Sequence, residues 1–210
     1  MKRWKPGVLL QGVPLVVHTL IPALEAVDQL ILVGGYQFEE LEKLVTASHM
    51  ISAAQKSKIT LVENNDYSAG MFSSVCLGLS LVHPSQDGVY IVPGDMPSIS
   101  VETYRTLAAV LAAEAGPDVF VPTLQIESDI NTGAQRPKKG HPVLVRRRVI
   151  SGILAKSRTA ILRDVLKQFQ SKTILVSDPG ICFDVDEESD AARLDLDFHL
   201  TRHQKNGPAS

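Results

Sequence analysis

One carboxylate, that of Asp95, stands where an α/β protein would place a ligand-binding group. It follows the apolar run 89–92 and is followed two residues later by Pro97. No charged residue interrupts the run, which is typical of a strand buried on both faces in a parallel sheet. Ligands of open α/β sheets bind just beyond the carboxyl ends of the strands. Asp95 is therefore a candidate site residue, although an aspartate beside glycine and proline is also common in simple turns.

Strands and helices alternate on both sides of this run, and their order sets the expected fold. We expect strands at 28–35, 58–62, 89–92, 119–121, 141–147 and 173–176. We expect helices at 14–27, 38–51, 70–82, 101–113, 159–169 and 187–196. Such alternation predicts a Rossmann-like α/β domain, with a mostly parallel, doubly wound sheet between two helical layers. Asp95 would then lie at the carboxyl end of a central strand.

Two stretches depart from this alternation. Residues 125–140 form a polar loop that is longer than most internal connections, and such loops are often functional or disordered. Basic side chains in and after this loop would attract a phosphate-bearing ligand: Arg136, Lys138, Lys139 and the arginines at 146–148. Residues 201–210 are expected to be a disordered tail, which leaves 1–200 as one domain.

Composition excludes several classes of protein. A chain of 210 residues with 44% hydrophobic residues has enough apolar surface for a sizeable single core. Its formal net charge of −2 gives no positive field for nucleic acid or an anionic membrane. Cys76 and Cys182 are too few and too far apart for a disulfide framework or a zinc site, and we find no signal peptide. We therefore expect a cytoplasmic protein.

Five short segments in a fixed order resemble a known family. They are Lys5 with Gly-Val-Pro-Leu at 12–15, Gly-Met-Phe-Ser-Ser-Val-Cys-Leu-Gly-Leu at 70–79, Gly-Asp-Met-Pro at 94–97, Gly-His-Pro-Val-Leu at 140–144 and Asp-Val-Asp-Glu-Glu-Ser-Asp at 184–190. Their order and separation are more specific than any single motif. The sequence resembles the MobA-like NTP transferases, in particular the cytidylyltransferases of the molybdenum cofactor. The resemblance implies the nucleotidyltransferase fold, also called the nucleotide-diphospho-sugar transferase fold.

The resemblance also implies a reaction, the transfer of CMP from CTP to a molybdopterin-type molybdenum cofactor with release of pyrophosphate. Such chemistry depends mainly on positioning and charge neutralisation. Asp95 would bind Mg²⁺ together with Asp184 or Asp186, a number of carboxylates that suits magnesium. Lys5 would contact the phosphates. The alternatives are that Asp184 and Asp186 are acids at a helix N-terminus and that Lys5 is a solvated terminal lysine.

Two further groups of residues are placed near ligands by the resemblance. The nucleotide-binding group is Asn65, Gly70, Met71, Ser73 and Ser74, and the group near the pterin is Gly140, His141 and Pro142. The alternative for the first group is a turn and a helix start with small capping residues. The alternative for His141 is a hydrogen-bonded structural histidine. The serine pair at 73–74 resembles the cytidylyl branch more than the guanylyl branch.

The largest departure from the family lies at the start of the chain. The family's first strand and glycine-rich loop, whose backbone amides hold the triphosphate, would fall entirely before Met1. One hypothesis is a complete cytidylyltransferase whose start codon is placed too late. A second is a truncated, non-catalytic protein that binds the cofactor or a partner such as a molybdenum hydroxylase. A third is a nucleotidyltransferase of the same fold that uses GTP or a sugar phosphate. We expect the chain as written to be a poor catalyst.

Overall fold

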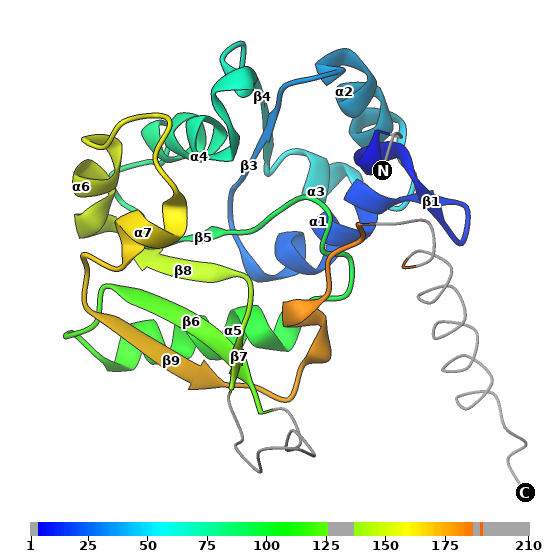
Figure 1. Ribbon diagram of the computed structural model, residues 1–210. Coiled ribbons are helices and arrows are strands. Elements are labelled where there is room, and N and C mark those ends of the chain that lie inside the picture. Colours follow the sequence, from blue (N-terminus) through cyan, green and yellow to red (C-terminus); the bar gives the residue numbers. More distant parts are fainter. Residues whose placement is uncertain (1–3, 126–136, 187–189, 191–210) are drawn as a thin grey trace, which may run out of the picture.

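The computed structural model describes residues 4–125, 137–186 and 190. In this part of the chain, strands form a central layer with helices on both faces, so the predicted three-layer α/β architecture is confirmed (Figure 1). The expected helix at 187–196, the expected tail at 201–210 and Arg136 lie outside the described residues. Among the helices that are described, none is long and apolar enough to cross a membrane.

The first half of the chain builds a parallel pair of strands. The 3₁₀ helix η1 (Lys5–Gly7) and the hairpin of β1 (Leu9–Leu10) and β2 (Val13–Pro14) lead into α1 (Leu15–Ala26). The next elements are β3 (Leu30–Gly34), α2 (Phe38–Ala47), α3 (Ala53–Lys56), β4 (Ile59–Glu63), η2 (Tyr67–Ala69) and α4 (Met71–Ser80). β3 and β4 pair in parallel, with Leu32 opposite Leu61. A helix between two strands that run in the same direction is the usual parallel connection.

The second half builds a mixed sheet. Its elements are β5 (Gly88–Ile91), α5 (Val101–Ala113), β6 (Val119–Leu124), β7 (Lys138–Lys139), β8 (Val143–Arg146), η3 (Arg147–Val149), α6 (Ile150–Leu154), α7 (Leu162–Leu166), β9 (Ser171–Leu175) and η4 (Pro179–Cys182). α5 has the predicted bounds, and Ser100 caps it by accepting a hydrogen bond from the backbone N–H of Thr103. The helix expected at 159–169 is shorter, and α6 forms where no helix was expected.

The expectation of a mostly parallel sheet is wrong for this half of the chain. β8 lies between β5 and β6 and runs antiparallel to both, whereas β9 pairs with β6 in parallel. The physical reason is the connection. The chain leaves the carboxyl end of β6, makes the short strand β7 against the same end of β6, and enters β8 without an intervening helix across the described residues. A strand entered in this way runs back in the opposite direction.

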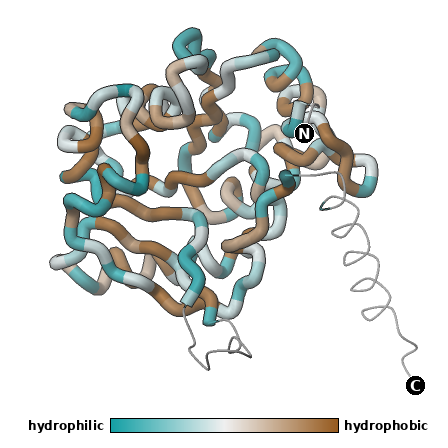
Figure 2. The backbone as a smooth tube through the Cα atoms, in the orientation of Figure 1, coloured by the Kyte–Doolittle hydropathy of each residue, from teal (hydrophilic) through white to brown (hydrophobic). Residues whose placement is uncertain are grey.

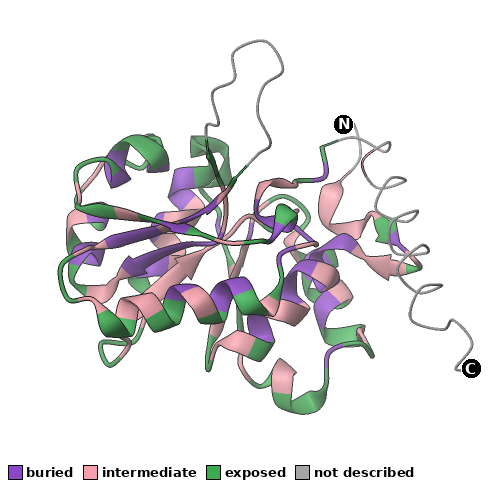
Figure 3. Cartoon of the chain, turned by 90° about the horizontal axis from the view of Figure 1, so that it is seen from below, coloured by how far each residue is buried: buried purple, intermediate pink, exposed green. Residues whose placement is uncertain are grey.

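Two helical layers bury the two faces of the strands, and apolar residues follow the strands accordingly (Figure 2). On one face, α4, α6 and α7 pack against Val119, Val143 and Val145. On the other face, α5 packs against Phe120 and Leu144. Neighbouring residues of β6 and β8 thus serve opposite layers, as the alternation of side chains along a strand requires. Buried residues are concentrated on the strands and on the inward sides of the helices (Figure 3).

β3 and β5 each have one free edge among the described residues. β3 pairs with β4 and β5 pairs with β8, and no described strand joins the two sheets. Helices connect the sheets instead. α4 packs on β5 and also brings Gly78 against Val33, while Leu30 and Tyr90 share a cluster with α1 and α5. The residues of β5 are consequently half-buried, which corrects the expectation of a strand covered on both faces.

Candidate active site

Lys5 lies between two carboxylates that come from distant parts of the chain. Its Nζ donates one hydrogen bond to Asp95 Oδ2 at 3.0 Å and another to Asp186 Oδ1 at 2.6 Å. The Asp95 side chain is 24% exposed and that of Asp186 is 65% exposed. The structure therefore brings together three of the residues selected from the sequence, in an ion-pair cluster that is open to solvent at Asp186.

The turn after β5 fixes the position of Asp95. The Thr19 hydroxyl in α1 donates a hydrogen bond to the carbonyl oxygen of Gly94 at 3.2 Å. The backbone N–H of Val185 donates to the carbonyl oxygen of Asp95 at 3.0 Å. Met96 is buried in the cluster formed by α1 and α5. The backbone on either side of Asp95 is thus held in place, and the carboxylate of Asp95 contacts Lys5.

The segment that carries Asp184 and Asp186 is anchored by the residue between them. Val185 is fully buried against Leu10 and Leu15, whereas both aspartates are exposed. Of Asp184 and Asp186, only Asp186 forms a hydrogen bond with Lys5 among the described contacts. Asp184 lies near enough to His141 for its negative charge to act on the histidine pKa. The two acids are therefore neighbours at the site, with different partners.

Electrostatics keep this site charged at neutral pH. Burial acts to lower the pKa of Lys5, but the hydrogen bonds to Asp186 and Asp95 and their negative charges outweigh burial, so this pKa is raised. The hydrogen bond from Lys5, followed by its positive charge, lowers the pKa of Asp186. Burial lowers the pKa of His141, although the charges of Asp95 and Asp184 oppose this. The site thus combines the Lys5 ammonium, the carboxylates of Asp95, Asp184 and Asp186, and the imidazole of His141.

The two carboxylates suit a divalent cation. Asp95 Oδ2 and Asp186 Oδ1 both contact one nitrogen atom, Lys5 Nζ, so they converge on a single positive charge. Mg²⁺ is commonly held by one or two carboxylates together with phosphate oxygens and water. In the described part of the chain, no three His, Cys, Asp or Glu side chains are grouped for metal binding. The two carboxylates match the number that Mg²⁺ takes in sites where phosphate and water supply its other ligands.

The segment expected near the nucleotide is organised by Asn64. This buried residue donates from Nδ2 to Ser73 Oγ and Ser74 Oγ, both at 2.9 Å, and its Oδ1 accepts from the backbone N–H of Asp66 at 3.0 Å. Ser73 is itself fully buried and donates to the carbonyl oxygen of Gly70 at 2.7 Å. The hydroxyl of Ser73 thus stabilises the start of α4 through a buried hydrogen bond, and it is not accessible to a ligand.

Other residues of the same segment face solvent. Asn65 is exposed, and Met71 is 65% exposed at the first turn of α4. Gly70, directly before the helix, has φ of 104°, a conformation that side-chain-bearing residues rarely adopt. The sharp entry into α4 therefore depends on glycine, and it leaves Asn65 and Met71 available to a ligand.

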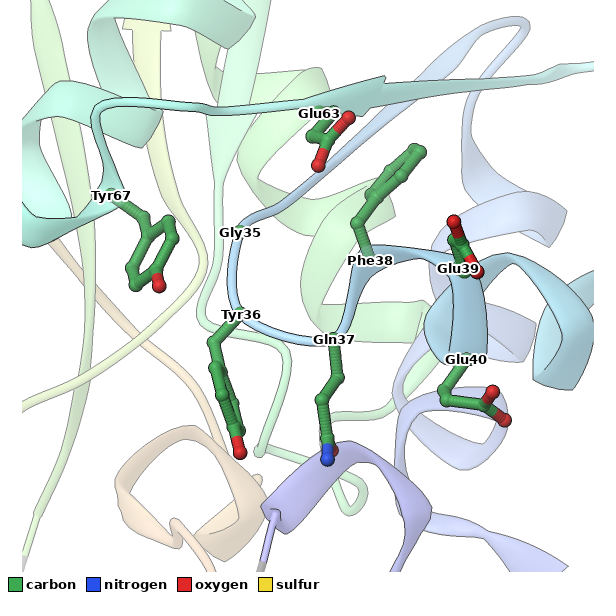
Figure 4. A pocket seen from close by; sticks show the side chains of 8 residues that line it. All are labelled: Gly35, Tyr36, Gln37, Phe38, Glu39, Glu40, Glu63 and Tyr67. Atoms are coloured by element: carbon green, nitrogen blue, oxygen red, sulfur yellow. The ribbon is translucent and has the colours of Figure 1, made fainter.

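A pocket of about 370 Å³ opens beside this segment, at the carboxyl ends of β3 and β4. Its lining includes Tyr36, Gln37, Glu63 and Tyr67. Figure 4 shows the side chains of Tyr36 and Gln37 pointing in one direction from the loop after β3, away from Phe38. Gly35 allows this loop to approach Tyr67, because an added Cβ would lie 2.4 Å from the Tyr67 Cβ.

The segment expected near the pterin is packed against η4. The backbone N–H of His141 donates to the carbonyl oxygen of Ile181 at 2.9 Å. His141 Nδ1 lies 3.4 Å from the carbonyl oxygen of Ile91, and Pro142 is buried. An added Cβ on Gly140 would lie 2.1 Å from the Ile181 oxygen, so this close approach requires glycine. Gly140 and Pro142 are thus held in the framework, and the imidazole lies at the end of β5.

Two of the basic residues expected to attract phosphate have structural partners instead. Arg146 Nε donates to the carbonyl oxygen of Pro117 at 2.7 Å, and its Nη2 donates to that of Leu111 at 2.8 Å. Arg148 Nε forms an ion pair with Asp118 Oδ1 at 2.5 Å. Lys138 and Lys139 are exposed on β7. Arg147 is half-buried, and its buried Nε has no hydrogen-bond partner among the described residues. The expected positive bias is therefore reduced by the pairing of Arg146 and Arg148.

Comparison with known proteins identifies the family. Residues 1–173 match the family described as the MobA-like NTP transferase domain, which is most of the chain. The chain belongs to this MobA-like family. The resemblance found in the sequence is thereby confirmed, and the protein is an enzyme of the nucleotidyltransferase class.

Individual relatives agree with this assignment. The molybdenum cofactor cytidylyltransferase of Escherichia coli is 24% identical over 194 residues, covering 90% of this chain and 83% of the relative. A structure of Rv0371c from Mycobacterium tuberculosis in complex with manganese is 23% identical, with a TM-score of 0.63 and 90% of each chain covered. A CMP:2-keto-3-deoxy-manno-octonic acid synthetase in complex with CTP is 16% identical, with a TM-score of 0.69, covering 95% of this chain and 94% of the synthetase. The two structures support the nucleotidyltransferase fold.

Sequence reasoning about this MobA-like chain missed the residues that line the pocket. Tyr36 and Tyr67, two large aromatic residues of this lining, are 63% and 48% exposed. A signal was present, because Tyr36 follows the glycine pair that ends the strand β3. A large residue at that place lies at the carboxyl end of a strand, where ligands of α/β proteins bind.

Proposed function

We propose that this MobA-like protein transfers CMP from CTP to a molybdopterin-type cofactor and releases pyrophosphate. The observation that carries the proposal is the convergence of Asp95 and Asp186 on Lys5. In the proposed reaction, an oxygen of the cofactor's terminal phosphate forms a bond to the α-phosphorus of CTP. The bond from that phosphorus to the oxygen of the β-phosphate breaks, and pyrophosphate leaves.

The charged cluster accounts for the main requirement of this chemistry, which is to offset negative charge on phosphate. Asp95 and Asp186 would hold Mg²⁺, which neutralises charge on the oxygens around the breaking bond. Lys5 is protonated at neutral pH, because the ordinary pKa of lysine is far above 7 and that of Lys5 is raised further. On nucleotide binding, the ammonium of Lys5 would exchange a carboxylate partner for a phosphate oxygen. Asp184 would be the second acid available to the ion.

The cytosine would bind beside the start of α4. Asn65, Gly70, Met71 and the serine pair at 73–74 form the nucleotide-binding group of the proposal. Within this group, Asn65 and Met71 are exposed, whereas Ser73 is buried and accepts a hydrogen bond from Asn64. The neighbouring pocket has aromatic walls, and aromatic rings favour stacking with flat heterocycles. A pyrimidine with one amino group is the base that we propose for this pocket.

The acceptor would bind near Asp95, against the segment Gly140, His141 and Pro142. His141 would be neutral at pH 7, because burial lowers its pKa. In a neutral imidazole whose Nδ1–H donates to the Ile91 carbonyl oxygen, Nε2 is left as an acceptor, which suits an amino or N–H group of a pterin ring. Gly140 and Pro142 would fix the backbone that presents His141.

The experiment is a comparison of nucleotides and acceptors. Pyrophosphate release is measured with CTP and with GTP, each with Mg²⁺ and with molybdopterin or a sugar phosphate as acceptor. The proposal expects release with CTP and molybdopterin, at the low rate expected for the chain as written and with at least a tenfold preference over GTP. Release only with GTP, or only with a sugar phosphate, would assign a different substrate. If calorimetry detects binding of molybdopterin but no pairing gives turnover, the protein is a cofactor-binding protein and the proposal is wrong.

A further inference from the structure

Asp178 is a buried carboxylate that the cluster around Lys5 does not include. Its Oδ2 accepts hydrogen bonds from the Ser100 backbone N–H and hydroxyl, both at 2.9 Å, and from Thr103 Oγ1 at 2.6 Å. Its Oδ1 accepts from the backbone N–H of Gly180 at 2.9 Å. Among the described residues, no lysine or arginine forms an ion pair with it. Four donors therefore satisfy this carboxylate.

These bonds join two segments that flank the active site. Ser100 and Thr103 belong to the first turn of α5, which follows the turn containing Asp95. Gly180 belongs to η4, which precedes the segment containing Asp186. A carboxylate at the N-terminus of a 13-residue helix is also favoured by the helix dipole. Asp178 thus caps α5 from a distant part of the same chain and links the C-terminal segment to this helix.

The backbone of η4 packs closely against the turn before α5. An added Cβ on Gly180 would lie 2.0 Å from the carbonyl oxygen of Ser98, so η4 lies directly on the turn that leads from Asp95 to α5. On the far side of η4, Ile181 accepts the hydrogen bond from His141. η4 is therefore held by the contact of Gly180 with Ser98 and by the hydrogen bond between His141 and Ile181.

The same segment then reaches the carboxylates. Val185 donates its backbone N–H to the carbonyl oxygen of Asp95, and its side chain is fully buried. Asp186 follows directly and contacts Lys5. The distance between the carboxylates of Asp95 and Asp186 hence depends on the position of η4 against α5. Asp178 fixes that position through its hydrogen bonds to Ser100, Thr103 and Gly180.

We propose that Asp178 is a positioning residue for this reaction, which sets the separation of Asp95 and Asp186 by fixing η4 on the N-terminus of α5. This inference rests on the proposed function for its metal site. It goes beyond that function, because Asp178 contacts neither Lys5 nor the two carboxylates in the described contacts, and it acts through the backbone between Gly180 and Val185.

The experiment uses Asp178→Asn with two companions. Thr103→Val removes one of the four donors and is the milder variant if Asp178→Asn folds poorly. Asp118→Asn is the control. It also removes a mostly buried carboxylate with a hydrogen-bonded partner, Arg148, but Asp118 directly precedes β6 and does not contact η4 among the described hydrogen bonds. Two quantities are measured without substrate: hydrogen exchange of the amides at 181–186, and the Mn²⁺ dissociation constant by electron paramagnetic resonance.

Asp178→Asn should increase exchange at 181–186 and weaken Mn²⁺ binding by about tenfold, the effect of losing one charge-assisted hydrogen bond. Thr103→Val should give a smaller change of the same kind, and Asp118→Asn should change neither quantity. Unchanged exchange and unchanged Mn²⁺ binding in Asp178→Asn would overturn the proposal. If exchange increases but the unaltered protein binds no Mn²⁺, Asp178 still positions Asp186, and the metal site of the proposed function is wrong.

Discussion

Lys5 and Asp186 are separated by 181 positions in the chain, yet their side chains are joined by a hydrogen bond of 2.6 Å. The same Lys5 nitrogen also contacts Asp95. An ammonium thus occupies the point on which two carboxylates converge. A divalent cation bound by the same carboxylates would compete with Lys5 for this point, unless a phosphate draws the lysine away.

The first prediction concerns this competition. Lys5→Met should strengthen Mn²⁺ binding several-fold in the absence of nucleotide, because it removes the competing positive charge. The same variant should lower turnover by about 10²–10³-fold, the usual effect of losing one donor to a developing negative charge. Paramagnetic resonance and pyrophosphate release measure the two effects. Lys43→Met, which breaks the exposed pair with Glu40, is the control and should change neither. Weaker Mn²⁺ binding by Lys5→Met would contradict the competition.

The second prediction concerns Asp95. Asp95→Asn should lower the rate of pyrophosphate release by a few orders of magnitude, because loss of a metal-binding charge costs several kcal/mol in the transition state. Its melting temperature should change little, since the carboxylate is partly exposed and only Lys5 is a described partner. Glu102→Gln on the surface of α5 is the control. A variant at near-full rate would show that Asp95 is a turn residue.

The third prediction is a pH dependence that originates at His141. Because burial lowers its pKa in the folded protein, protonation favours the unfolded chain. This histidine should therefore add stability above about pH 6.5, its ordinary pKa, and that stability should be lost as the pH falls through the lower folded value. Urea unfolding at several pH values between 7.5 and 5 measures the slope. His141→Gln should flatten it, and an equal slope in the two proteins would disprove the assignment.

The fourth prediction separates two neighbouring asparagines. Asn64→Ala should lower the free energy of unfolding by about 2–3 kcal/mol, because it removes three hydrogen bonds from a buried site. Asn65→Ala should change stability by no more than about 0.5 kcal/mol, because this residue is exposed. In the proposed function it should instead weaken CTP binding, measured by calorimetry. Equal stability of both variants would show that the Asn64 network is not important.

Local features of the chain were readable from the sequence. α5 begins after Ser100 and has its predicted bounds, because helical periodicity and a capping serine act over neighbouring residues. β3, β4, β5, β6 and β9 lie within one to three residues of their expected bounds for the same reason. The selection of Lys5, Asp95 and Asp186 came from the order of short motifs, and hydrophobic periodicity alone left Asp95 as a possible turn residue.

Tertiary structure decided the direction of β8, the burial of Asn64 and Ser73, and the partners of Lys5. The antiparallel direction of β8 follows from the path of the chain after β6, which residue types along β8 do not encode. Asn64 and Asn65 are identical residues in one turn, and only the packing of α4 on β3 makes one structural and leaves the other exposed. A contact such as that between Lys5 and Asp186 depends on every element placed between them. Propensity and periodicity act over one or two turns of chain, and cannot fix such a distance.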